Sequence, residues 1–202
     1  MTRLLLLLFY ILIPFKSFAL IEVDITRGNL NPLPIAVSPL SIDENSRQNF
    51  EKILKKKNIG EEISKIIEVN LKTSGLFNPL NKDAFLQAPD IANLKPRFED
   101  WNLIKAQALI TGKVSYTDEK LRVEFRLWDV LAGKEMVALA FTTVPTNWRR
   151  VGHIITDKVY QRLTGEKGYF DTRIIYVAEE GPKTKRIKKL AIMDQDLSLI
   201  HI

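Results

Sequence analysis

The sequence predicts a mixed α/β (α+β) domain with one mixed sheet and two main helices. The clearest strand is Leu121–Val130, in which Leu, Val, Phe and Leu alternate with charged residues at the period of two that marks a half-buried strand. Strand patterns also fill Ala106–Val114 and Lys134–Val144, and the connections are short. Helical spacing of apolar residues marks Gly60–Thr73 and Asn147–Leu163. We therefore expect a three-stranded antiparallel meander covered by two helices.

The composition excludes several classes of chemistry. The 202 residues contain no cysteine, which removes disulfides, thiolate catalysis and cysteine-ligated zinc sites. The formal net charge is +6, but five of the positive charges lie within Lys183–Lys189. Without that patch and the first nineteen residues, the chain is close to neutral. The charge therefore does not indicate a general nucleic-acid-binding protein.

Residues 1–19 have the pattern of a secretory signal peptide. Arg3 gives a positive start, Leu4–Ile13 is an unbroken apolar run, and Ser17-Phe18-Ala19 fits the small-x-small cleavage rule. The alternative is a membrane anchor, but the apolar run is shorter than the roughly 20 residues that a spanning helix needs. We expect export, with cleavage near Ala19.

Two strand candidates, Ile21–Thr26 and Leu33–Leu40, begin the expected domain of residues 20–168. Prolines bracket the second strand, so we expect it to be short or to lie at a sheet edge. A strand that begins at a cleavage site can fray or pair with the sheet edge of another protein. An ordinary first strand fits the pattern equally well.

Between the first strands and the meander, we expect a surface helix in Asp43–Lys57, a short extended piece at Leu76–Leu80, a loop over Ala88–Pro96 and a short helix over Phe98–Lys105. The last of these should turn Trp101 inward.

The second main helix should be capped by Asn147 and stopped by Gly165. Arg149 and Arg150 fall in its first turn, where the helix dipole disfavours cations. The pair is a candidate surface contact, for instance with acidic residues, although a solvated pair is the commoner arrangement. Residues 169–196 then change character, because two strand patterns, Thr172–Ala178 and Ile187–Asp194, read as the opening of a second, all-β domain.

No catalytic or metal-binding pattern is present in the sequence. His153 lies between Gly152 and Ile154 on the second main helix, where a structural or surface histidine is expected rather than a base or ligand, and His201 lies in the final six residues. Paired carboxylates occur only between adjacent residues, and no glycine-rich phosphate loop has the required spacing. We expect a protein that is not an enzyme and that uses no cofactor or metal ion.

Five stretches resemble the TolB family of the Tol–Pal system. They are DITRGNLNPLPIAV (24–37), SGLFNPL (74–80), the region 101–130 with AQALITGKV and LRVEFRLWDV, NWRRVGHIITDKVYQRLTGEKGYFDTRIIY (147–176) and RIKKLAIMDQD (186–196). The resemblance covers nearly all of residues 21–196.

The resemblance implies an amino-terminal domain similar to anticodon-binding domains, followed by a six-bladed β-propeller. It implies a non-enzymatic periplasmic adaptor, peripheral to both membranes, that links inner-membrane TolA to outer-membrane Pal during cell division and in outer-membrane integrity. The extreme amino-terminal segment would contact the C-terminal domain of TolA, and the propeller would bind Pal. Carried onto this chain, the TolA-binding residues would be Glu22, Val23, Asp24, Ile25 and Thr26.

The chain departs from the family pattern after Met193-Asp194-Gln195-Asp196, where residues 197–202 replace the expected continuation. We expect residues 169–196 to be the first strands of a truncated propeller and residues 197–202 to be a non-native tail. The alternative function is a periplasmic binding module for an acidic polymer or lipid surface, which Lys183–Lys189 and Asn147–Arg150 would serve. Binding to nucleic acid is not expected.

Overall fold

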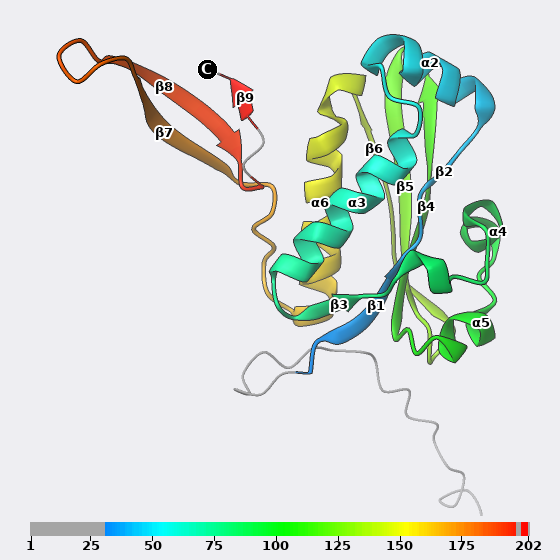
Figure 1. The fold of residues 1–202 in the computed structure, drawn as a ribbon. Helices are drawn as coiled ribbons and strands as arrows, with labels where there is room; N and C mark the ends of the chain where they lie inside the picture. Colours follow the sequence, from blue (N-terminus) through cyan, green and yellow to red (C-terminus); the bar gives the residue numbers. More distant parts are fainter. Residues whose placement is uncertain (1–30, 197–198, 202) are drawn as a thin grey trace, which may run out of the picture.

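A computed structural model describes residues 31–196 and 199–201. The first sheet has the strand order β3-β1-β4-β5-β6, with the short β2 also pairing with β4, and a second sheet has the order β7-β8-β9. Helices α3 and α6 lie side by side over one face of the first sheet, while α4 and α5 lie on its other face (Figure 1). The β7–β8 hairpin projects away from the two helices. The predicted mixed α/β class is confirmed.

The predicted meander forms the main part of the first sheet. Strands β4 (Ala108–Thr117), β5 (Lys120–Asp129) and β6 (Lys134–Thr143) pair antiparallel in sequence order. The apolar residues of β5 are buried as their alternation predicts, namely Leu121, Val123, Phe125 and Leu127. Asp118 and Glu119 both adopt positive φ in the β4–β5 turn, which is the geometry of a tight hairpin.

The parallel part of the sheet confirms one of the two alternatives expected for the second strand. Strand β1 (Leu33–Val37) is short, as expected, but it lies between β3 (Phe77–Pro79) and β4 rather than at an edge. Pro34 is tolerated because its carbonyl still accepts the Gln107 amide at 2.9 Å, and its missing donor falls at the first rung beside β4. Strand β2 (Ser41–Ile42) continues the pairing along β4.

Helices α3 (Ile59–Thr73) and α6 (Trp148–Thr164) bury the larger core against the sheet. Gly165 ends α6 at a φ of 77°, as predicted. The Asn147 cap was predicted wrongly. A 3-10 turn (η2, Pro145–Asn147) leads into the helix, and the Asn147 amide donates to Thr143 Oγ1 at 3.1 Å instead.

Helix α2 (Glu44–Leu54) lies where the sequence places a surface helix, and Asp43 caps it by accepting the Ser46 amide at 2.9 Å. Burial of Phe50 fixes the helix to the sheet, where the Phe50 ring meets Tyr116 edge to face. Helix α2 is therefore held by both a cap and a core contact.

The opposite face of the sheet carries a smaller core built around Trp101. The segment Ala88–Pro96, expected as a loop, contains helix α4 (Pro89–Leu94), which Pro89 starts in a conformation already suited to a first turn. Helix α5 (Phe98–Leu103) follows and buries Trp101, as predicted. A 3-10 turn, η1 (Lys82–Ala84), precedes both helices.

Strands β7 (Arg173–Glu180), β8 (Ile187–Asp194) and β9 (Leu199–His201) form the second sheet. The first two confirm the predicted hairpin. Large apolar side chains remain exposed on it, among them Ile174, Ile175, Val177, Ile187 and Leu190. A two-stranded hairpin of this kind buries too little surface for independent stability. Residues at its ends contact both α3 and α6.

Candidate functional site

The structure describes only one of the two sets of predicted contact residues. The proposed TolA-binding residues, Glu22 to Thr26, lie outside the described residues. Arg149 and Arg150 lie in the first turn of α6, and each forms an ion pair with a residue next to the second sheet. The described part of the candidate site is therefore the joint between α3, α6 and the ends of the β7–β8 hairpin.

Both arginines form ion pairs with carboxylates that follow α6 in the sequence. Arg150 Nε and Nη2 donate to Asp171 at 3.0 and 3.1 Å, and these hydrogen bonds raise the pKa of the guanidinium. Arg149 pairs with Asp196, just beyond β8. The contact with acidic residues is what the structure shows, rather than a solvated pair. These partners offset the unfavourable position of two cations at a helix start.

Beneath Arg149, a buried polar cluster joins the two main helices. The amide nitrogen of Asn70 on α3 lies 2.9 Å from Nδ1 of His153 and 3.2 Å from Thr156 Oγ1, both on α6. Gln195 donates to Asn70 Oδ1 at 3.3 Å and so connects the end of β8 to the same cluster. Hydrogen bonds between buried polar groups on different elements favour one relative orientation of those elements.

His153 is the most enclosed member of this cluster, with 1% of its surface exposed. Burial lowers the pKa of its imidazole, and the nearby Asp196 and Asp194 carboxylates oppose that effect only in part. Nε2 lies 3.7 Å from the Asp196 carboxylate. As Asn70 is oriented, it donates to Nδ1, so the ring proton belongs on Nε2, which faces Asp196.

His153, Asp194 and Asp196 place one potential ligand atom each within 4.8 Å of one another. A metal ion would need Nε2 without its proton, which conflicts with the Asn70 hydrogen bond. The Arg149 guanidinium already neutralises Asp196. As the side chains are arranged, a protonated Nε2 therefore faces the Asp196 carboxylate from beyond hydrogen-bond distance, and the three groups do not fit a metal ion.

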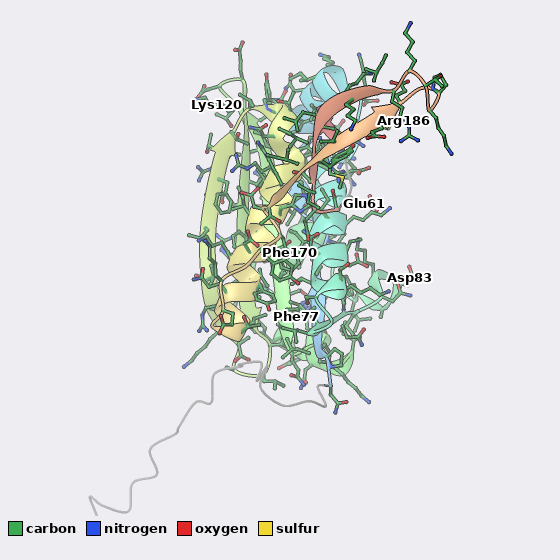
Figure 2. The ribbon with its side chains drawn as sticks, turned by 90° about the vertical axis from the view of Figure 1, so that its left-hand side faces the viewer. Glu61, Phe77, Asp83, Lys120, Phe170 and Arg186 are labelled. Atoms are coloured by element: carbon green, nitrogen blue, oxygen red, sulfur yellow. The ribbon has the colours of Figure 1, made fainter. Side chains whose placement is uncertain are left out.

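The linker into the second sheet is bound to α6 through Asp157. Its Oδ1 accepts the Phe170 amide at 2.6 Å and its Oδ2 accepts the Asp171 amide at 3.1 Å. A Cβ on Gly168 would lie 2.4 Å from Asp157 Cα, so only glycine allows this approach. Phe170 is fully buried beside Tyr160 and near Phe77, while Arg186 lies at the far tip of the hairpin (Figure 2).

The sequence did not reveal the Asn70–His153–Asp196 arrangement, because its members come from three distant segments. The only available signal was a single histidine on a helix, which predicts a structural or surface residue rather than a base or ligand. Its burial selects the structural alternative. Among the described residues, no helix is long and apolar enough to cross a membrane.

A model of the TolB amino-terminal domain matches residues 21–136, which is more than half of the chain. The Tol-Pal system protein TolB of Pelagibacter ubique (strain HTCC1062) is 81% identical over 191 residues, or 95% of this chain. The chain spans 43% of the length of that relative.

The solved structure of TolB from Acinetobacter baumannii has a similar fold, with a TM-score of 0.65 at 23% identity. The match covers 88% of this chain and 40% of that one. The predicted family resemblance is confirmed by the sequence matches. The chain belongs to the TolB amino-terminal domain family, which is not a family of enzymes.

Proposed function

We propose that this chain is the amino-terminal part of a periplasmic, non-enzymatic adaptor of the Tol–Pal system. The observation that carries the proposal is the close relationship to a Tol-Pal system protein along almost the whole of this chain. In this proposal, Glu22–Thr26 contact the C-terminal domain of TolA, and the Pal contact belongs to a β-propeller that begins with β7 and β8. The adaptor thereby joins inner-membrane TolA to outer-membrane Pal during division.

The second sheet supports the propeller part of this proposal. Ile175 and Val177 are exposed by 63% and 58%, and Leu190 on the paired strand by 68%. Apolar side chains in such numbers are normally covered by neighbouring strands. The polar joint at Asn70 and His153 would then set the angle between the amino-terminal domain and the propeller.

The alternative, a binding module for an acidic polymer or lipid surface, has less support. Three of the five basic residues in Lys183–Lys189 already form ion pairs across the hairpin: Arg186 and Lys188 with Glu179, and Lys189 with Glu180. Arg149 and Arg150 are likewise paired. Little uncompensated positive charge is left on these surfaces to attract an anionic polymer.

Photo-crosslinking in cells tests the TolA contact. A photoreactive side chain placed at Val23 or Ile25 should yield a covalent product with TolA. The same group at Ile174, an exposed apolar position on the second sheet, serves as the matched control. Crosslinking to TolA from Ile174 and not from Val23 or Ile25 would contradict the proposed segment.

A further inference from the structure

Strand β6 has one edge that no strand of the described residues covers. It pairs with β5 alone and ends the first sheet. Its central stretch, Val137–Phe141, reads VALAF and contains neither charge nor proline. Natural proteins usually protect a long edge strand with inward charges, proline or a covering element, because its free amides and carbonyls can pair with another strand. Within the part of the chain that the structure describes, the middle of β6 lacks these protections.

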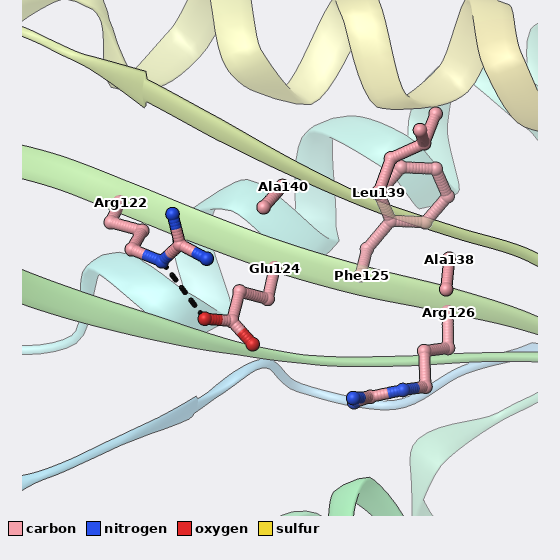
Figure 3. Close-up of a pocket in the computed structure, with 7 residues that line it drawn as sticks. All are labelled: Arg122, Glu124, Phe125, Arg126, Ala138, Leu139 and Ala140. Carbon is pink, nitrogen blue, oxygen red and sulfur yellow. Dashed lines mark hydrogen bonds and ion pairs between the residues drawn. The ribbon is translucent and has the colours of Figure 1, made fainter.

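The two faces beside this edge differ in chemistry. On the helix side, Leu139 lies next to Phe125 and is still 41% exposed. On the other side, Ala138 and Ala140 leave a shallow depression of about 210 Å³ next to the charged residues of β5. Figure 3 shows Phe125 and Leu139 projecting toward α6, while Glu124 and Arg126 project away from it.

We propose that β6 pairs antiparallel with β6 of a second copy of this chain, around a twofold axis at Leu139. The two sheets then continue into each other, as in an isologous dimer. Leu139 faces its own counterpart, and Val137 faces Phe141 of the second copy. On the helix side, the apolar side chains of the two β6 strands therefore cover one another.

The charges of β5 select this register. Arg126 pairs with Ala138 and Glu124 with Ala140 within one sheet. An axis at Leu139 sets Ala138 opposite Ala140 of the second copy, so Arg126 and the second copy's Glu124 share one row. An axis at Ala138 would align two Arg126 side chains, and an axis at Ala140 would align two Glu124 side chains. Like charges in one row oppose pairing.

The distance suits these two side chains. They stand three strand spacings apart, about 14 Å, and only alanines lie between them. An extended arginine and an extended glutamate can reach toward each other over the depression, so that their opposite charges attract across the two alanines. Within one chain, Arg126 Nε lies 3.4 Å from a carboxylate oxygen of Glu135. Arg122 Nε lies 2.9 Å from a carboxylate oxygen of Glu124. Both pairs are partly exposed, so each can be shared with the second copy. The proposal does not depend on the Tol–Pal assignment.

Sedimentation equilibrium of the purified protein tests the dimer. We expect a concentration-dependent mass that rises toward twice that of one chain and Leu139→Lys to hold it at the monomer value. The matched control is Ile175→Lys, which alters an exposed apolar residue on the second sheet. This control should associate like the parent. Loss of association in Ile175→Lys with retention in Leu139→Lys would assign it to the hairpin and overturn the proposal.

A charge exchange tests the register. Arg126→Glu should weaken dimerisation at least about tenfold, because it aligns two glutamates in each row. The double variant Glu124→Arg with Arg126→Glu should recover most of that loss, since the opposite charges return in exchanged positions. Thermal melting would confirm that each variant is folded. A monomer at all concentrations up to about 1 mM, or no recovery in the folded double variant, would overturn the proposal.

Discussion

The Asn70 amide nitrogen on α3 lies 2.9 Å from His153 Nδ1 on α6, and this contact joins the two helices inside the core. It holds a neutral imidazole in place, because the nitrogen that accepts from Asn70 cannot also carry a proton. Stability should therefore depend on the protonation state of one buried histidine.

Lowering the pH below about 6.5 should destabilise the protein through His153. The folded-state pKa is lowered by burial, so the unfolded state binds the proton more readily. The contribution is complete above the unfolded pKa and is lost as the pH falls through the lowered folded pKa. Urea unfolding at pH 8, 7, 6 and 5 measures this dependence. In His153→Gln, which cannot titrate, the slope below pH 6.5 should become shallower. An unchanged slope would contradict the assignment.

Asp157 should stabilise the linker to the second sheet. Replacing it with alanine leaves the Phe170 and Asp171 amides without their acceptors, at a cost of about 1–3 kcal/mol in unfolding free energy. Lys158→Ala, an exposed change one residue along the same helix, should stay within about 0.5 kcal/mol. Chemical denaturation compares the two variants. Equal stability in both would mean that the linker is not bound as described.

Phe170→Ala should be one of the most damaging changes in the linker. Phe170 is fully buried in the larger core, so truncation should cost about 3–5 kcal/mol. The adjacent Tyr169 is 45% exposed, and Tyr169→Ala should cost clearly less. Thermal and urea unfolding measure both variants. A larger loss for Tyr169→Ala would show that the chain enters the core one residue earlier.

Amide hydrogen exchange should separate the two sheets. The backbone amides of β7 and β8 should exchange far faster than those of β4 and β5, because the hairpin packs against little else and leaves its apolar residues exposed. Mass spectrometry of exchanged peptides measures the difference. Protection across Arg173–Glu180 equal to that of β5 would contradict this prediction.

The sequence was sufficient for elements whose burial follows a simple period. Strand β5 and helices α3 and α6 each repeat apolar residues on one face, so their type and approximate bounds could be predicted. Helix α4 could not, because six residues that begin with proline carry too little periodic signal. The inner position of β1 also escaped prediction, since the order of parallel strands depends on packing between distant segments.

The candidate site could likewise be predicted only in part from the sequence. The conflict of Arg149 and Arg150 with the helix dipole was visible in the sequence, and their acidic partners account for it. The partners themselves, Asp171 and Asp196, could not be chosen among 24 acidic residues without the fold. The hydrogen bonds between Asn70, His153 and Gln195 likewise depend on three segments meeting in space.

Calorimetric titration with the TolA C-terminal domain tests the proposed adaptor role most directly. The purified protein would be compared with a variant that lacks residues 20–31, and Arg150→Ala would serve as a control on the described surface. We predict binding by the parent and by Arg150→Ala, and no binding by the deletion variant. Binding that survives the deletion, or absence of binding by the folded parent, would contradict the role proposed for the amino-terminal segment.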